Sequence, residues 1–260
     1  MGTLHFLDVG CADASVIISD AATFLVDCQG IGDYPHLLPK SRRIRGVFMT
    51  HQHSDHYSGL DYLRKNEHSI DFLIYSPYER RYNDASVTLD EWNEFNDYRD
   101  YFVGRGTELR TPFKQEEGSG PWKEPFWQAE KGLRFWILGP EKGVASSESR
   151  ELHDACLVVR ADLGARICTF TGDASDANLV SVASGIDNIC GDILHASHHG
   201  SIEGASLAFL KKCSPKWTVI STASGKYPNV PHPAALQRYK ENSSEGVWRT
   251  DVDGSGEIKF

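Results

Sequence analysis

The segment THQHSDHYSG (residues 50–59) brings three histidines and an aspartate into six consecutive positions. Imidazole and carboxylate groups are the ligands that zinc and similar ions take in proteins. The segment directly follows the apolar run 47–49, which predicts a buried strand. A chain that leaves a buried strand can turn these side chains towards one point at the edge of a sheet. The segment therefore predicts a metal site, and the alternative of a solvated histidine-rich loop rarely has this order.

The spacing divides the candidate ligands between two ions. His51 and His53 alternate along the chain and fit one ion. Asp55 and His56 begin the next helical turn and are expected to reach a second ion nearby. Gly59 is expected to relieve the turn that follows.

The composition is that of a globular protein. The chain has 260 residues, of which 40% are hydrophobic and 24% charged, and it carries a formal net charge of −9. This charge argues against coating nucleic acid through bulk positive charge, but not against an enzyme that meets phosphates through metal ions. The apolar runs fall far short of the roughly 20 residues that a membrane helix needs. The start of the chain lacks the basic region of a signal peptide, so we expect a cytoplasmic protein without membrane contact.

The spacing of the cysteines indicates neither a disulfide framework nor a metal site. They are scattered without a CxxC pair, and without an export signal they are expected to be reduced and mostly buried. The six residues are Cys11, Cys28, Cys156, Cys168, Cys190 and Cys213.

Short strands dominate both halves of the chain. Strand-like runs lie at 4–9, 15–19, 23–28, 46–50, 71–75, 133–138, 156–161, 166–171, 193–197, 217–222, 247–250 and 257–260. Helical patterns lie at 60–64, 175–183, 204–213 and 233–240. Strand clusters flanked by helices in both halves predict two sheets packed face to face with helices outside.

Residues 76–130 interrupt this rhythm and are interpreted as an insertion. Thr88 and Glu91 have the spacing of a capping box, and apolar residues follow at helical spacing up to Phe102. The stretch from Gly104 to Trp127 has no clear period and predicts a long loop. The inserted helix and loop either overhang the site or form a surface elaboration with its own small cluster.

The HxHxDH pattern of residues 51–56 resembles the signature of the metallo-β-lactamase superfamily. Its form here is most similar to the metallo-β-lactamase-like domain of the ComEC/Rec2 DNA-uptake proteins. Four further motifs, one before this pattern and three after it, occur in the order of that family. They are DVGCADA at 8–14 with LVD at 25–27, TGDA at 171–174, HHGS at 198–201, and PHP at 231–233 with TDVDG at 250–254. Cys11 and Ala12 depart from the pattern. The resemblance implies an αββα sandwich that forms one domain over 1–260, with its metal site at the sheet edges.

The resemblance also implies the remaining ligands. Asp173 corresponds to the carboxylate that bridges the two ions. His153 stands where the third ligand of the first ion is expected, and the alternative is a loop histidine. His198 is the expected ligand of the second ion, with His199 as a supporting or oxygen-binding group; the preference between the two is slight.

Other polar residues near these motifs have less certain roles. His232, between two prolines, is expected to donate a proton or bind a phosphate oxygen, with a structural role as the alternative. His195 is expected to be a packed core histidine. Asp27 is expected to lie under residues 50–59, the metal loop, and to orient it. Asp27 and Asp13 equally fit turn caps. The basic run 40–45 is either a solvated loop or a local phosphate track.

The predicted activity is hydrolysis with two divalent ions, zinc first and manganese second. Seven ligands are expected: His51, His53, Asp55, His56, His153, Asp173 and His198. Asp55, His199 and His232 are the predicted catalytic groups. The resemblance implies cleavage of a phosphodiester, such as nucleic acid, without the membrane channel of the uptake proteins. An esterase or lactonase is the alternative, with a small pocket near Trp122, Phe126 and Trp127. A binding module without turnover is the third hypothesis. His53 argues against the di-iron branch, which has Glu there.

Overall fold

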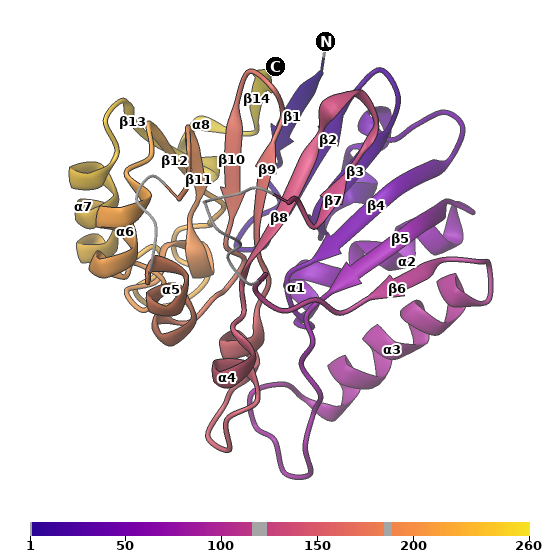
Figure 1. The fold of residues 1–260 in the computed structure, drawn as a ribbon, viewed down its shortest axis with the longest axis horizontal. Helices are drawn as coiled ribbons and strands as arrows, with labels where there is room; N and C mark the ends of the chain where they lie inside the picture. The colour runs from indigo at the N-terminus through magenta and orange to yellow at the C-terminus, as the bar shows by residue number, and fades with distance from the viewer. Residues whose placement is uncertain (1, 116–123, 185–188) are drawn as a thin grey trace.

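Two seven-stranded sheets pack face to face in the computed structural model, which describes residues 2–115, 124–184 and 189–260 (Figure 1). The first sheet has the order β14-β1-β2-β3-β4-β5-β6 and the second β13-β12-β11-β10-β9-β8-β7. The first contains β1 (Thr3–Phe6), β2 (Ala14–Ile18), β3 (Thr23–Cys28), β4 (Arg43–Met49), β5 (Ser69–Tyr75), β6 (Glu108–Arg110) and β14 (Gly256–Lys259). The second contains β7 (Trp127–Gln128), β8 (Arg134–Gly139), β9 (Val158–Asp162), β10 (Ile167–Phe170), β11 (Ile193–His195), β12 (Trp217–Ile220) and β13 (Gly246–Arg249).

Helices cover the outer faces of both sheets (Figure 1). The helices in the described part of the chain are α1 (Ser54–Tyr57), α2 (Gly59–Lys65), α3 (Leu89–Val103), α4 (Lys142–Ala145), α5 (Asp176–Ala183), α6 (Leu207–Cys213), α7 (Pro233–Asn242) and α8 (Thr250–Asp253). Short 3₁₀ turns lie at Ile31–Asp33, Pro35–Leu37, Glu130–Gly132, Leu152–Ala155 and Ser197–Gly200. The predicted αββα sandwich is confirmed. No helix in the described part of the chain is both long and apolar enough to cross a bilayer.

The core has three layers because each sheet is buried on both faces. Phe6, Phe24, Phe48, Phe135 and Phe170 lie between the sheets. A second apolar cluster packs the first sheet against its helices, and a third packs the other sheet against α5, α6 and α7. Every residue of β3 is buried, and the middle of the strand, residues 24–26, is continuously apolar.

The topology fixes where the site lies. In the first sheet β3, β4 and β5 run parallel, and in the second β10, β11 and β12 run parallel. Parallel strands end at the same edge, and loops at their carboxyl ends are the usual place for ligands in such sheets. The segments after β4, β10 and β11 carry the predicted metal ligands except His153, which lies in the turn before β9, a strand antiparallel to β10.

The segment 76–130 contributes to both sheets. Helix α3 begins with the predicted capping box, in which Thr88 accepts from the Glu91 amide, and it buries Phe95 and Phe102. Strands β6 and β7, which the sequence did not predict, extend one sheet each. Trp127 lies in the core between the sheets, 5.2 Å from the ring of Phe24. Residues 116–123, including Trp122, lie outside the described residues, and the insertion boundaries stay a prediction.

The predicted cysteine states need one correction. Cys190 and Cys213 form a disulfide, with Cα atoms 4.8 Å apart, so the prediction of a reduced thiol is wrong for this pair. The other four cysteines are free and buried, as predicted. The two paired residues are 23 positions apart and have no sequence pattern that marks them. Only the packing of α6 beside the start of β11 brings them together.

Candidate metal centre

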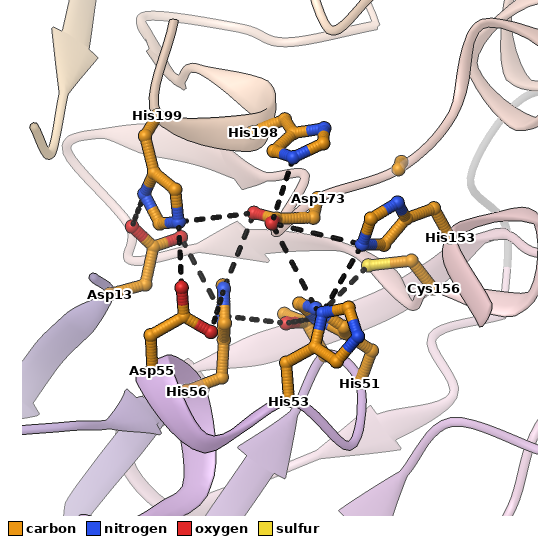
Figure 2. Close-up of polar contacts among 12 residues, drawn as sticks. Asp13, His51, His53, Asp55, His56, His153, Cys156, Asp173, His198 and His199 are labelled. Atoms are coloured by element: carbon orange, nitrogen blue, oxygen red, sulfur yellow. Dashed lines mark hydrogen bonds and ion pairs between the residues drawn. The ribbon is translucent and has the colours of Figure 1, made fainter. Parts of the chain in front are cut away.

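Histidine and aspartate side chains of the described residues converge at the edge of the sandwich in four overlapping groups (Figure 2). Two of these groups contain most of the predicted ligands, and the other two include Asp13. Within each group the ligand atoms all lie within 4.8 Å of one another. The first group is His51, His53, His153 and Asp173, and the second is Asp55, His56 and His199.

Three imidazoles meet in the first group. His51 Nε2 lies 3.1 Å from His53 Nδ1, and His153 Nε2 lies 3.3 Å from the same His53 nitrogen. Asp173 Oδ2 is 3.9 Å from both His51 Nε2 and His153 Nε2. Ring nitrogens and a carboxylate oxygen gathered this closely form a ligand set that suits one zinc-like ion. His153, predicted from its place in the sequence, is part of this group.

Asp173 also faces the second group, with its other oxygen. Asp173 Oδ1 lies 3.3 Å from His56 Nε2 and 3.7 Å from His199 Nε2. Asp55 lies 3.8 Å from His56 Nε2 through one oxygen and 3.5 Å from His199 Nε2 through the other. The two oxygens of Asp173 therefore point to different groups, which is the geometry a carboxylate needs to bridge two ions.

The buried polar atoms of the site fit bound cations. Leaving a buried donor or acceptor without a partner costs about 1–3 kcal/mol, so such atoms are rare in folded proteins. Five of them face this site without a hydrogen bond to any described residue: His56 Nε2, His199 Nε2, Asp173 Oδ1 and both carboxylate oxygens of Asp13. Imidazole nitrogens and carboxylate oxygens are the ligands of zinc and manganese, so these atoms fit two divalent ions.

A buried aspartate orients the metal loop from beneath. Asp27 accepts hydrogen bonds from the Thr50 amide at 2.8 Å and from the Thr50 hydroxyl at 2.7 Å. Its Oδ2 also lies 2.9 Å from His56 Nδ1, which turns the opposite ring nitrogen towards the centre. This is the orienting contact predicted for Asp27.

The glycine before Asp173 permits a close approach of two loops. Gly172 has φ +46°, and a Cβ atom there would lie 2.4 Å from Thr50 Oγ1. A side chain at this position would push the Asp173 segment away from the metal loop. The TGDA motif therefore has a steric reason for its glycine.

Burial and neighbouring charges shift the pKa values of the site histidines in opposite directions. Burial alone would lower the pKa of His56 and of His199, but neighbouring carboxylates, Asp173 first among them, raise both pKa values well above the usual range. Burial would raise the pKa of Asp173, and His199 and His56 instead hold it well below its usual range. Burial dominates for His51 and His153 and lowers both pKa values, that of His153 to about 4. Neutral imidazole is the form that binds metal, so burial favours the metal-binding form of His51 and His153.

The structure places His199, rather than the slightly preferred His198, in the second ligand group. Both residues lie in the left-handed region, with φ 52° and 51°, and their rings diverge at an interplanar angle of 77°. His199 is buried and joins the second group, whereas the His198 side chain is 30% exposed. His198 Nε2 still lies 3.7 Å from Asp173 Oδ2, and its ring contacts that of His153 at 4.7 Å. The geometry favours His199 as the ligand and places His198 at the rim.

His232 caps a helix and is not part of either ligand group. Its Nδ1 accepts a hydrogen bond from the Ala234 amide at the start of α7. These contacts support the structural alternative for His232. His195 is buried between the rings of Phe6 and Phe170 and contacts Ser221 Oγ at 2.7 Å, as expected for a core histidine.

Asp13 is a site residue that the sequence left as a turn cap. Its side chain is buried, with Oδ1 3.4 Å from His199 Nδ1 and Oδ2 3.8 Å from His195 Nδ1. Its amide donates to the Asp55 carbonyl at 3.1 Å, which ties the first loop to the metal loop. The signal was its place in DVGCADA, a motif that the fold brings under His199.

The fold and the site agree with the family that the chain matches. The model of the metallo-β-lactamase superfamily matches residues 8–222. No curated protein matches the chain.

Three solved structures illustrate the similarity of fold. The metallo-β-lactamase fold protein YhfI from Bacillus subtilis has a TM-score of 0.59 at 13% identity, with 99% of this chain and 100% of that chain covered. A diphosphatase from the PhnP family has a TM-score of 0.53 at 14% identity, with 100% and 98% covered. A variant of the β-hydroxylase CmlA has a TM-score of 0.60 at 13% identity, with 100% of this chain but 54% of that chain covered. At these identities the likeness shows the fold alone.

The family match covers most of the chain and includes every residue of both ligand groups. The two groups share one bridging aspartate and confirm the prediction of a dinuclear type of site. The chain belongs to the metallo-β-lactamase superfamily and is a metallo-hydrolase of the dinuclear type.

Proposed function

We propose that this hydrolase cleaves phosphodiesters. The observation that carries the proposal is the bridging geometry of Asp173, with one oxygen towards each ligand group. Paired ions about 3.5–4 Å apart are the arrangement that enzymes use for in-line displacement at phosphorus. The resemblance of the chain's motifs to the nuclease-like domain of the uptake proteins supports the same reaction class. So does the similarity of its fold to a PhnP-family diphosphatase.

The residues of both groups would hold the two ions. His51, His53 and His153 would bind the first, Asp55, His56 and His199 the second, and Asp173 both. Zinc fits these ligands best, and manganese is the second choice. When bound, such ions lower the pKa of water and offset negative charge on a phosphoryl group.

The protein's own groups prepare this chemistry. Asp27 holds His56 by a 2.9 Å contact and keeps the ring in one orientation. Asp13 supports His199 from the opposite side of its ring. Asp55 is the one member of the second group whose side chain is partly exposed, at 27%, and it lines an open hollow beside the site. It therefore lies where a substrate would meet the metal ligands.

No structural observation favours the esterase or lactonase alternative. Its aromatic pocket was expected from Trp122, Phe126 and Trp127. Trp127 lies in the core, and Phe126 packs against that core. The third hypothesis, a binding module without turnover, has the complete ligand set against it.

Substrate competition tests the proposal. The full chain, supplemented with zinc or manganese, is assayed with bis(4-nitrophenyl) phosphate, DNA and RNA, and in parallel with 4-nitrophenyl acetate and a simple lactone. We expect hydrolysis of a phosphodiester and its loss with EDTA. Turnover of the ester or lactone alone would refute the proposal. Less than one metal ion per chain after supplementation would favour the binding module.

A further inference from the structure

An open hollow of about 350 Å³ adjoins the second ligand group. This volume is at the lower end of the range for small-molecule sites. Its walls come from the metal loop, from α3 and from the loop that follows β12. The lining residues are Gln29, His53, Ser54, Asp55, Ser58, Glu91, Lys226 and Tyr227.

The loop after β12 presents Lys226 and Tyr227 on an anchored turn. The Ser224 amide and hydroxyl donate to Asp251 Oδ2 at 3.0 and 2.5 Å. The Lys226 amide donates to the Ala223 carbonyl at 3.2 Å, which closes the turn. Farther on, the His232 amide donates to the Gly200 carbonyl at 2.9 Å. The turn is therefore fixed on one side to α8 and on the other to the segment that carries His199.

Lys226 is the one lysine or arginine among the residues that line the hollow. It forms no ion pair within the described part of the chain, and its Nζ lies 5.5 Å from the centre of the Tyr227 ring. The acidic neighbours are otherwise engaged. Glu91 accepts hydrogen bonds from Thr88 and Ser54, and Asp55 belongs to the second ligand group. The ammonium group is thus available to an anionic oxygen.

Tyr227 supplies an aromatic face beside this cation. Its side chain is 47% exposed even though the turn that carries it is ordered by backbone contacts. Tyr227 can stack on a planar ring of a ligand while Lys226 pairs with the phosphate that the ligand carries. The two side chains therefore suit a ligand with an aromatic ring and a phosphate. Stacking on such a ring tolerates any base, because every base has a π-face.

Three of the four cations in the basic run 40–45 are paired with neighbouring acids, which weakens this run as a track for a longer polyanion. Arg43 Nε lies 2.9 Å from Asp71, and Arg45 contacts Asp71 at 3.0 Å and Glu130 at 2.9 Å. Arg42 pairs with Glu67 at 3.4 Å. These cations are neutralised by neighbouring acids, and the whole chain carries a net charge of −9. A polynucleotide would find few free cations here.

We propose that the hollow binds a nucleotide-sized phosphodiester rather than a polynucleotide. Lys226 holds a non-bridging phosphoryl oxygen, and Tyr227 stacks on the aromatic ring of the substrate and so favours phosphodiesters that carry such a ring over those that do not. This inference rests on the proposed phosphodiesterase function.

Equilibrium binding tests the assignment without requiring turnover. The metal-supplemented full chain is titrated calorimetrically with thymidine 5′-monophosphate and, separately, with inorganic phosphate. Tyr227→Ala is expected to weaken nucleotide binding about 5- to 100-fold and to leave phosphate binding within about twofold. Lys226→Met is expected to weaken binding of both ligands by about tenfold or more. Tyr227→Phe, which keeps the ring, should retain nucleotide affinity.

Matched controls are Lys240→Met on α7 and Tyr82→Ala, whose ring is 93% exposed; both should bind like the wild type. Wild-type affinities in Lys226→Met and Tyr227→Ala would overturn the assignment, as would wild-type protein that binds phosphate as tightly as the nucleotide. Faster hydrolysis of a 20-nucleotide DNA than of a dinucleotide would overturn the proposed preference for nucleotide-sized substrates. If the wild type hydrolyses no phosphodiester at all, the proposed function itself fails. If the wild type hydrolyses phosphodiesters but Lys226→Met and Tyr227→Ala bind the nucleotide like the wild type, the proposed function stands and only the assignment of this hollow fails.

Discussion

Asp27 and His56 lie 29 residues apart in the sequence, yet Asp27 Oδ2 is 2.9 Å from His56 Nδ1 and both side chains are fully buried. The contact joins the end of β3 to the loop after β4. Because these strands are parallel neighbours, their carboxyl ends lie side by side. The aspartate can therefore hold the histidine ring from behind while the opposite nitrogen faces the metal centre.

Asp27→Asn is expected to lower metal affinity about 10- to 100-fold, the usual cost of losing a group that orients a ligating histidine. The amide keeps the size of the side chain but loses the charge that faces His56. Competition with a chromophoric chelator measures the change. Asp33→Asn, at an exposed position, is the control. Unchanged affinity in Asp27→Asn would remove the orienting role.

His53→Ala and Asp173→Ala are each expected to abolish metal-dependent hydrolysis while the far-UV circular dichroism stays close to that of the wild type. His53 contributes one of three imidazoles to the first group, and Asp173 contributes an oxygen to each group. Full activity in His53→Ala would show that the reaction does not depend on this centre.

Metal removal is expected to lower thermal stability. An ion present at about 100 times its dissociation constant stabilises the folded chain by about 2.7 kcal/mol, which for a chain of this size raises Tm by about 5–10 °C. Differential scanning calorimetry of the EDTA-treated chain, before and after zinc is added, measures the shift. His36→Ala, at an exposed position, should show the same rise, and His53→Ala a smaller one. A Tm that does not respond to zinc in the wild type contradicts the expectation.

Glu91→Ala is expected to lower the free energy of unfolding by about 0.5–2 kcal/mol, because it removes the capping box of α3. The same carboxylate accepts from Ser54 Oγ at 3.1 Å and so links α3 to the metal loop. Urea denaturation compares this variant with Asp90→Ala, the exposed neighbour in the same turn, for which a change within about 0.5 kcal/mol is expected. Equal effects at both positions would mean that the cap contributes nothing specific.

Gly59→Ala is expected to destabilise the chain by about 3 kcal/mol or more. A Cβ at this position would lie 1.7 Å from the Cys28 carbonyl oxygen, so β3 and α2 would have to move apart. Gly143→Ala in α4, where nothing lies within 4 Å of the new atom, should change stability by less than about 1 kcal/mol. Similar denaturation midpoints for the two variants would argue against the close approach.

The sequence suggested that Gly59 relieves a turn. In the structure Gly59 begins α2, and its lack of a side chain allows close approach to the Cys28 carbonyl of β3. Helix α3 was predictable from its capping box and its apolar spacing, because both are local. Leu89 at its start is nevertheless 54% exposed.

Contacts between distant segments were less predictable. Strands β6 and β7 are three and two residues long, and their pairing comes from neighbouring strands rather than from their own pattern. Cys190 and Cys213 carry no spacing signal for a disulfide. Asp13 had the appearance of a turn residue until the fold placed it under His199.

The sequence alone determined the order of the candidate ligands, from His51 in the metal loop to Asp173 after its glycine. This order can be read from the sequence because the ligands lie in short motifs directly after predicted strands. The sequence also determined the sandwich, since short apolar strands and flanking helices have distinct periods. Only the tertiary structure gives a reason to prefer His199 over His198 as the ligand. Both follow the same strand, and the left-handed backbone at each turns one ring inward and the other to the rim. Such a choice depends on the surrounding contacts that fix the backbone, which no local pattern encodes.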